Sequence, residues 1–232
     1  MKECNHDCTT CVFKEQSLLN ELSHDELSIL ESHRNSVEYQ SGEVIYKEGM
    51  KATELLCVNS GMVKILKKTG KGEDRAMDVK KPIEFIGFQA LMSNEAHQDT
   101  AIAMVDTGIC SIDKADLMRV IENNSGFALK VIEDQAKELN YSTQRLLALT
   151  DKNMKSRMCD TLLRLLDDFG VDETGALTVN LKRREIAGLS NMTTSNAIRT
   201  LSEIAKDGLI ELVGKKIIIT DRPGVEQVST SG

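Results

Sequence analysis

The stretch from Leu181 to Ile219 constrains the fold of this 232-residue chain most strongly, because it carries two short helical patterns and then a hairpin pattern. Residues 182–188 form the first helical pattern, and Leu189-Ser190-Asn191 provides a turn. Thr193 stands where the N-cap of a second helix is expected, since its hydroxyl can accept a hydrogen bond from a free backbone N–H. The buried face of that second helix recurs at helical spacing as Met192, Ala197, Leu201, Ile204 and Ala205.

Two short β-like runs follow Gly208, a residue type that commonly ends helices. They cover residues 209–212 and 216–220, and Gly214-Lys215 between them supplies a tight turn. A further helix, with Asp151 as its N-cap and Gly170 as its end, precedes this unit. The sequence therefore predicts a winged helix-turn-helix domain over residues 151–232.

The outer face of the second helix carries the residues that indicate a function. A recognition helix meets base edges in the major groove with the residues near its N-terminus, which here are Thr194, Ser195, Ile198 and Arg199. Arg199 can donate two hydrogen bonds to guanine, and Ile198 can contact a thymine methyl group. At the start of the first helix, we expect Lys182 to contact phosphates and Arg183 to be a further DNA-binding residue. The alternative is an amphipathic helix whose outer face is only solvated.

Charge is divided unevenly along the chain, which carries a net charge of −7. Residues 1–150 hold 17 basic and 24 acidic residues, whereas residues 151–232 hold 12 of each. Between Leu181 and Lys216 there are seven basic and four acidic residues. Phosphate contact requires a local positive field and not a basic protein overall, so this distribution is compatible with binding of double-stranded DNA by the C-terminal domain.

The N-terminal segment, residues 1–17, contains three closely spaced cysteines, Cys4, Cys8 and Cys11. They stand in a polar segment, so packing does not explain them, and three thiolates held together suit an iron–sulfur cluster or zinc. A fourth ligand would come from elsewhere in the chain. The alternative is a disordered tail whose thiols have no role.

Residues 18–125 show a helical pattern followed by many short strands. Leu18 to Ser32 is helical, with Ser23 capping its second half, and Lys114 to Ile121 is a second short helix. Between them, β-like runs alternate with glycines, which is typical of an antiparallel barrel or jelly roll. These runs cover residues 41–46, 55–58, 62–65, 83–87, 101–105 and 108–112. The fold class predicted for the whole chain is therefore α+β.

A long helix is predicted over residues 126–150. Its seam alternates spacings of three and four residues, and consists of Ile132, Gln135, Leu139, Ser142, Leu146 and Leu149. Such a seam predicts a dimerisation helix and a homodimer. Gln135 and Ser142 weaken the seam, so the dimer need not be permanent. The alternative is that this helix packs against its own barrel.

No stretch approaches the roughly 18 uninterrupted apolar residues of a membrane span, and no cationic leader precedes an apolar segment. We therefore expect a soluble, cytoplasmic protein that does not interact with membranes. Six cysteines in such a protein indicate metal binding or reactive thiols and not structural disulfides.

Taken together, these features resemble the CRP/FNR family of bacterial transcription regulators over almost the whole chain. The resemblance rests on the dimer helix and on five short motifs: Gly42-Glu43, Glu48-Gly49, residues 59–64, Phe85-Ile86-Gly87-Phe88 and Glu185-Ile186-Ala187 through Arg199. It implies a β-roll sensory domain like those that bind cyclic nucleotides, followed by the dimer helix and the DNA-binding domain. The implied partners are promoter DNA with an inverted-repeat site and RNA polymerase.

The cyclic-nucleotide branch of that family holds ribose and cyclic phosphate with a Gly-Glu pair and an Arg-Ser pair. Here Phe88 follows Gly87, and Gln98 and Asp99 stand at the Arg-Ser positions. A carboxylate where the phosphate should lie would repel it, and no arginine clamp remains. We therefore expect no cyclic nucleotide.

The FNR-like branch ligates a [4Fe–4S] cluster with N-terminal cysteines and one cysteine late in the β-roll. Cys110 falls on that late position, but Ser17 occupies the position of one family cysteine. The resemblance thus implies a cluster held by Cys4, Cys8, Cys11 and Cys110, in which Cys4 replaces the missing thiolate. Simple burial in a strand is the other explanation for Cys110. Cys57 and Cys159 match no motif position, and we predict that both are core thiols.

The sequence favours a redox- or oxygen-responsive transcription regulator. Alternatives with the same fold sense nitric oxide, or use the N-terminal cysteines as a thiol–disulfide or zinc switch. An enzyme of the radical S-adenosylmethionine class also carries closely spaced cysteines, but it needs a large α/β barrel, which these short strands do not offer. Ser195 replaces the glutamate usual in the family, so the operator sequence is not expected to match the family consensus.

Overall fold

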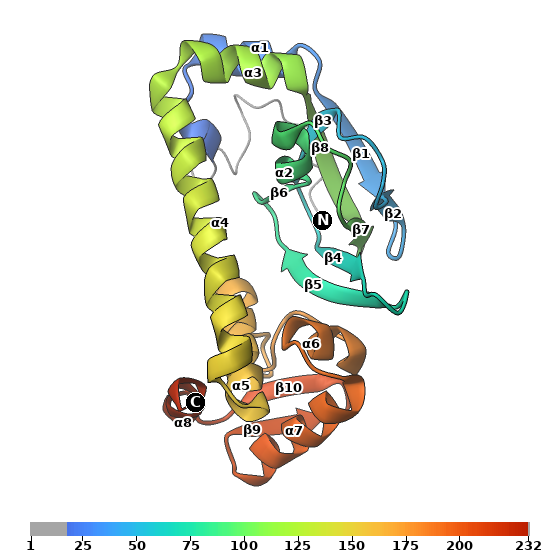
Figure 1. Cartoon of the computed structure of the whole chain (residues 1–232), viewed down its shortest axis with the longest axis vertical. Helices are drawn as coiled ribbons and strands as arrows, with labels where there is room; N and C mark the ends of the chain where they lie inside the picture. The colour runs from blue at the N-terminus through green and yellow to red at the C-terminus, as the bar shows by residue number, and fades with distance from the viewer. Residues whose placement is uncertain (1–17, 232) are drawn as a thin grey trace. The chain divides into compact units, whose positions relative to one another are not determined.

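The computed structural model describes residues 18–231 of the chain (Figure 1). It divides into two compact units: Met1–Asp74 with Asp78–Leu139, and Arg75–Met77 with Asn140–Gly232. The long helix α4 (Ser125–Asp151) contributes residues to both units. The α+β class, the β-roll, the long helix and the C-terminal helix-turn-helix are all present, as the sequence predicts.

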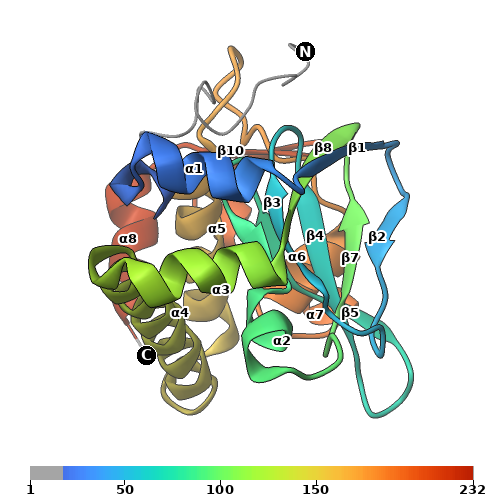
Figure 2. The same cartoon turned by 90° about the horizontal axis from the view of Figure 1, so that it is seen from above.

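The first unit contains two four-stranded antiparallel sheets, which together form the β-roll (Figure 2). One sheet has the order β1 (Asn35–Tyr39), β8 (Thr107–Asp113), β3 (Glu54–Val58) and β6 (Phe85–Ile86). The other has the order β2 (Val44–Tyr46), β7 (Thr100–Ala103), β4 (Val63–Lys68) and β5 (Asp74–Lys80). The apolar core of the roll includes Tyr46, Val58, Val63, Ile65, Ile86, Ala101 and Ile109.

A second core in this unit lies between the sheet β1-β8-β3-β6 and the helices that cover it. These helices are η2 (Leu18–Glu21), α1 (His24–Glu31), α2 (Phe88–Ser93) and α3 (Lys114–Asn123). Leu55 and Ile112, paired across β3 and β8, point into this core. Figures 1 and 2 both show α1 and α3 side by side. The capping role predicted for Ser23 is confirmed, because its hydroxyl accepts from the backbone N–H of Glu26 at 3.3 Å.

The second unit is built from α5 (Met154–Phe169), α6 (Arg183–Leu189), α7 (Thr194–Lys206), the hairpin β9 (Ile210–Val213) and β10 (Lys216–Ile219), and α8 (Arg222–Thr230). Its core includes Met158, Leu162, Ile186, Ala197, Leu201 and Ile204. Helix α8 packs along α5, and its Val225 is fully buried.

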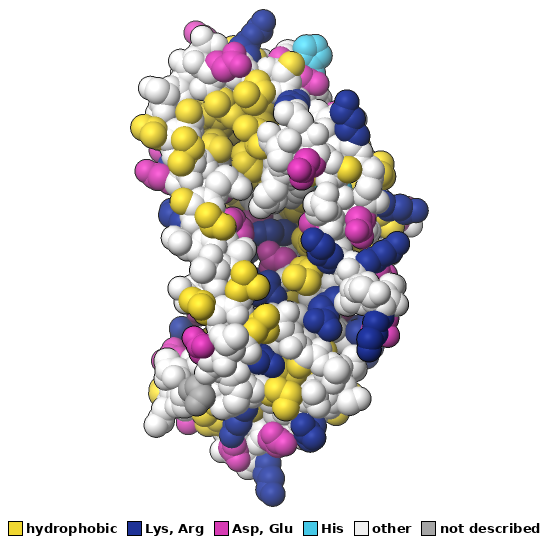
Figure 3. All heavy atoms as spheres, in the orientation of Figure 1, with side chains coloured by type: hydrophobic (Ala, Val, Ile, Leu, Met, Phe, Trp, Pro, Cys, Tyr) yellow, Lys and Arg dark blue, Asp and Glu magenta, His cyan; other side chains and the backbone are white. Residues whose placement is uncertain are grey.

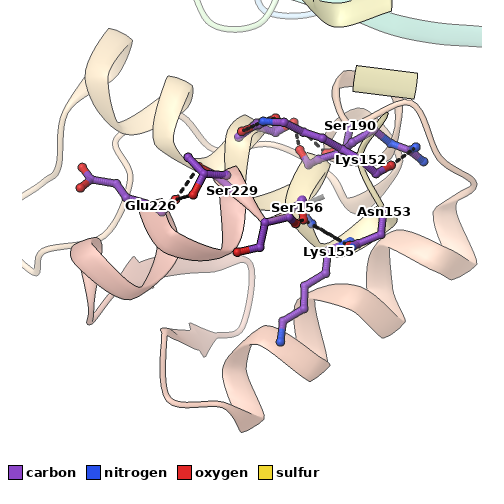
Figure 4. A network of polar contacts seen from close by, with 12 residues as sticks. Lys152, Asn153, Lys155, Ser156, Ser190, Glu226 and Ser229 are labelled. Atoms are coloured by element: carbon purple, nitrogen blue, oxygen red, sulfur yellow. Dashed lines mark hydrogen bonds and ion pairs between the residues drawn. The ribbon is translucent and has the colours of Figure 1, made fainter. Parts of the chain in front are cut away.

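The predicted cap of α5 is wrong. Asp151 is the last residue of α4, and Asn153 is the N-cap of α5. The Asn153 side chain accepts hydrogen bonds from the backbone N–H groups of Lys155 at 2.9 Å and Ser156 at 3.0 Å (Figure 4). Asparagine and aspartate are equally good N-caps, so two acceptable residues two positions apart could not be separated from sequence alone. Gly170 ends α5 with a φ of 69°, as predicted.

Among residues 18–231, no helix is both long enough and apolar enough to cross a membrane.

Candidate DNA-binding surface, dimer face and thiols

Helix α7 is anchored by a buried face that leaves its N-terminal outer face exposed. The Thr193 side chain accepts from the backbone N–H of Asn196 at 3.2 Å, which confirms the predicted N-cap. Ala197, Leu201 and Ile204 are buried, and so is Thr200, which the sequence pattern did not single out. The four predicted recognition residues are all exposed: Thr194, Ser195, Ile198 and Arg199.

The Arg199 side chain is 63% exposed. Its Nη2 lies 3.4 Å from the Asn196 side-chain oxygen, and its Nε lies 3.8 Å from a Glu203 carboxylate oxygen. Contacts of this length on an exposed surface are weak. The guanidinium can therefore leave them to form a bidentate pair with a base edge.

Helix α6 begins with a capping interaction in which Glu185 accepts from the backbone N–H of Lys182 at 2.8 Å. Ile186 and Ala187 are buried, as predicted. The Lys182 side chain is exposed, in keeping with the phosphate contact expected of it. Arg183 is half-buried instead, and its Nη2 donates to the carbonyl of Gly214 at 3.1 Å. Arg183 therefore supports the turn of the wing.

The wing is the predicted two-residue hairpin, with Val213 paired to Lys216 and Gly214 at a φ of 60°. Lys216 forms an ion pair with Asp172 at 2.7 Å. The ammonium group of Lys216, helped by Thr174, lowers the pKa of Asp172. The neighbouring residue Lys215 is also exposed. The sequence analysis had used Lys215 only as a turn residue.

Helix α4 exposes a row of large apolar side chains. Ile132, Leu139 and Leu146 are 63%, 68% and 66% exposed, and Leu149 and Ser142 are also exposed. Figure 3 shows hydrophobic side chains along the surface of this helix. The residues of α4 that pack into the first unit are Phe127 and Val131. Within the first unit, the seam residues Ile132 and Leu139 are therefore not part of the core.

One residue of the predicted seam, Gln135, does not lie on the exposed face of α4. Gln135 is half-buried and lines a cavity of the first unit, whereas Leu129, 61% exposed, and the exposed Ala136 flank Ile132 and Leu139. The exposed apolar face of α4 thus includes Leu129, Ile132, Ala136, Leu139 and Leu146, at successive spacings of three, four, three and seven residues.

The cavity of the first unit has a volume of about 760 Å³ and is rich in charged groups. Lys80 lies 3.0 Å from carboxylate oxygens of both Asp78 and Glu138. Burial lowers the pKa of Lys80, but the surrounding carboxylates outweigh burial and raise the pKa. The Asp99 carboxylate also lines the cavity and accepts from the Tyr46 hydroxyl at 2.8 Å, whereas Gln98 is exposed.

The described cysteines have three different environments. Cys159 is fully buried, and burial raises its pKa to about 11, so it is the core thiol that was predicted. Cys110 is half-buried in β8, and Nη1 of Arg34 donates to its sulfur at 3.1 Å. Cys110 is therefore not fully buried.

The prediction that Cys57 is a core thiol is wrong. Cys57 is half-buried in β3 and lies directly opposite Cys110 in the register of β3 and β8. Its apolar neighbours along the strand suggested a core position, and it shares a face of β3 with the buried Leu55, but Cys57 itself is only partly covered.

The other three predicted metal ligands, Cys4, Cys8 and Cys11, lie outside the described residues. Within the described part of the chain, no group of three or more histidine, cysteine, aspartate or glutamate side chains could hold a metal ion.

Comparison with known proteins agrees with this architecture. Residues 36–124 match the family model of the cyclic nucleotide-binding domain, and residues 156–228 match that of the Crp-like helix-turn-helix domain. The chain belongs to the CRP/FNR family of transcription regulators. Regulators of this family bind DNA and are dimeric, so this CRP/FNR protein is a DNA-binding regulator and not an enzyme.

Its relatives are distant. Electron transport regulator A of Shewanella oneidensis is 26% identical over 93% of this chain and 86% of its own length. The CRP-like cAMP-activated global transcriptional regulator of Mycobacterium tuberculosis is 24% identical over 84% of this chain and 88% of its own length. The structure of FixK2 from Bradyrhizobium japonicum matches with a TM-score of 0.75 at 22% identity, covering 86% of this chain and 98% of that one. That structural likeness supports the CRP/FNR fold.

Proposed function

We propose that this regulator couples promoter binding to oxygen or redox state through a [4Fe–4S] cluster held by Cys4, Cys8, Cys11 and Cys110. The observation that carries the proposal is the environment of Cys110, a half-buried sulfur with a cationic hydrogen-bond donor at 3.1 Å. Iron–sulfur clusters are held by thiolates, and hydrogen bonds to the sulfurs tune them. Cys110 fits such a ligand, and the N-terminal cysteines would supply the other three.

Cys110 stands where a ligand could influence the dimer helix. It lies in β8, which ends at Asp113, the N-cap of α3, and α3 leads directly into α4. An N-terminal segment tied to Cys110 is therefore attached close to the start of these helices. When bound, the cluster supplies a redox-active centre held only by thiolates.

The dimer formed through the exposed face of α4 is the element on which such a tether would act. Ser142 and Ala136 contribute little apolar area beside Ile132, Leu139 and Leu146, so the seam is short of the large side chains that make coiled coils permanent. A change of a few kcal/mol is enough to move a marginal equilibrium from one state to the other.

A two-fold dimer would present two copies of α7 to the half-sites of an inverted-repeat promoter site. In this proposal Arg199 reads a guanine in each half-site, with Thr194, Ser195 and Ile198 beside it. Lys182 and Lys215 contact phosphates, while Arg183 holds the wing turn. The protein acts in the cytoplasm, where RNA polymerase is its second macromolecular partner.

We also propose that the cavity of the first unit does not take a cyclic nucleotide. The carboxylates of Asp99, Asp78 and Glu138 line it, and the Lys80 ammonium group is already paired to two of them. A cyclic phosphate placed there would meet net negative charge without an arginine clamp.

Anaerobic purification followed by iron and acid-labile sulfide analysis tests the proposal. We expect a brown protein that loses its colour when serine replaces Cys4, Cys8, Cys11 or Cys110. Cys159→Ser, which changes a fully buried thiol, and Cys57→Ser are the matched controls and should retain iron. Iron-free protein that holds zinc, or a Cys110→Ser variant with full iron content, would overturn the assignment.

A further inference from the structure

Cys57 and Cys110 form a cross-strand pair that neither family model nor the proposed cluster explains. Strands β3 and β8 pair through five consecutive positions, from Glu54 opposite Asp113 to Val58 opposite Ile109. The cysteine pair is the fourth of these, in an unbroken antiparallel register. Residues directly opposite each other in an antiparallel ladder point to the same face of the sheet. Both thiols are half-buried there, so oxidants can reach them.

The backbone spacing of this pair suits a disulfide bond. Directly opposed residues have Cα atoms about 4.5–5.5 Å apart and Cβ atoms about 4.5–5.5 Å apart. Disulfides span Cα separations of about 4.4–6.8 Å with Cβ atoms about 3.5–4.5 Å apart. Closing the bond therefore needs the two Cβ atoms to approach by about 1 Å or less, which adjacent strands can accommodate without a change of register.

The two sulfurs differ in their electrostatic surroundings. Arg34 donates to the Cys110 sulfur at 3.1 Å, and its own Nε is held 3.1 Å from the Glu31 carboxylate. The Cys57 sulfur instead lies 3.8 Å from the carbonyl oxygen of Val58, toward which its S–H points. The guanidinium of Arg34 thus holds a hydrogen-bond donor directly against the Cys110 sulfur. On this geometry the first attack is assigned to Cys110, and Cys57, directly opposite it, resolves the product.

We propose that Cys57 and Cys110 are a redox site that peroxides convert reversibly to a cross-strand disulfide. The Cys110 sulfur attacks one oxygen of hydrogen peroxide and breaks the O–O bond to give a sulfenic acid, and the thiol proton joins the departing hydroxide to give one water. The Cys57 sulfur then attacks the sulfenic sulfur and loses its proton, and the displaced hydroxyl leaves as a second water. In total, two thiols and one hydrogen peroxide give one disulfide and two waters.

This site goes beyond the proposed cluster and is tested independently of it. Cys110 cannot be a cluster ligand and a disulfide partner at the same time, so the disulfide forms only in cluster-free protein. The test therefore uses the full chain in which serine replaces Cys4, Cys8 and Cys11. In that variant the only thiols are Cys57, Cys110 and Cys159.

Treatment with hydrogen peroxide, followed by mass spectrometry without reductant, gives the readout. We expect a mass loss of about 2 Da and a cross-link between the tryptic peptides of residues 52–64 and 81–114, both reversed by dithiothreitol. Adding Cys159→Ser should change nothing. Adding Cys57→Ser should stop the reaction at a dimedone-reactive sulfenic acid on Cys110, and Arg34→Gln should slow the cross-link.

Absence of the cross-link in folded, peroxide-treated protein would overturn this proposal. A sulfenic acid that persists on Cys110 while Cys57 is present would also overturn it, because a resolving thiol would consume that acid. Neither result bears on the cluster, which is judged from the iron content of the chain with all six cysteines. Conversely, protein without iron would sink the cluster and leave the disulfide test unchanged.

Discussion

Helices α4 and α7 are both amphipathic, yet their outer faces differ in kind. The outer face of α4 carries Ile132, Leu139 and Leu146, each more than 60% exposed. The outer face of α7 carries Thr194, Ser195 and Arg199, with Ile198 as its one large apolar side chain. On its other side α4 buries Phe127 and Val131 in the first unit, and α7 buries Ala197, Leu201 and Ile204 in the second.

The difference identifies the kind of partner that each face fits. Large apolar side chains left in water gain about 25 cal/mol for each Å² that a partner covers, so the α4 face fits a second apolar helix. The α7 face offers hydroxyl and guanidinium donors at a helix N-terminus, which fit base edges and phosphates. The same amphipathic pattern therefore fits a protein partner on α4 and DNA on α7.

Charging the α4 face should have the largest effect. In Leu146→Asp a two-fold dimer would bury an unpaired carboxylate twice, which should convert the dimer to monomer. Operator affinity should collapse with it, since the two half-sites are read together. Sedimentation velocity checks the assembly state. Val171→Asp, at an exposed apolar residue outside α4, is the control and should stay dimeric. A Leu146→Asp protein that is still dimeric would show that the exposed face of α4 does not form the dimer.

Removing the guanidinium from the α7 face should have the next largest effect. Arg199→Ala should cost about 1–3 kcal/mol of specific binding and relax the preference for one guanine in each half-site. Fluorescence anisotropy on operator and base-substituted duplexes measures both. Arg222→Ala, which removes an exposed arginine of α8, should leave affinity unchanged. Equal affinities for Arg199→Ala and the parent protein would mean that α7 is not the recognition helix.

Lysines at the edge of the DNA-binding surface should give a smaller and sequence-independent effect. Lys182→Ala and Lys215→Ala should each weaken binding to all duplexes alike and reduce the salt slope by about 1. Titrations at several salt concentrations measure that slope. Lys71→Ala, in an exposed turn of the first unit, should not change it. A change in base preference with either lysine variant would show that the residue reads bases.

The smallest expected effect concerns the junction between α4 and α5. Asn153→Ala removes two hydrogen bonds that cap α5 and should lower the free energy of unfolding by about 1 kcal/mol. Asp151→Ala, at the end of α4, should have a smaller effect. Thermal or urea unfolding compares the two variants. A larger loss of unfolding free energy for Asp151→Ala would show that Asp151, and not Asn153, caps α5.

The sequence predicted best those features whose signals are local. Thr193, Gly208 and Gly214 mark the start of α7, its end and the wing turn within a short stretch of chain, and all three behave as expected. Helix α8 also has a local signal that was missed, an aspartate N-cap at Asp221 followed by Pro223 in the first turn. Helix α2 has none, because its N-cap is Gly87, without a side-chain hydrogen bond.

Features that depend on distant residues could not be predicted from local patterns. The partner of Cys57 lies across the sheet, so the pairing with Cys110 depends on the register of β3 and β8. Gln135 likewise lines a cavity instead of the exposed face of α4, and that cavity is formed by residues that are far apart in the sequence. The contact of Arg183 with the wing turn is of the same kind, because its carbonyl partner belongs to Gly214, 31 residues further along the chain.

The most direct test of the central claim is the affinity of anaerobic protein for an operator before and after exposure to air. The operator is a duplex selected from a random pool by the anaerobic protein, and iron content is measured on the same samples. The account predicts tight binding by brown, iron-containing dimer and release when air removes the iron. The same affinity in both states, with iron present in one and absent in the other, would contradict it.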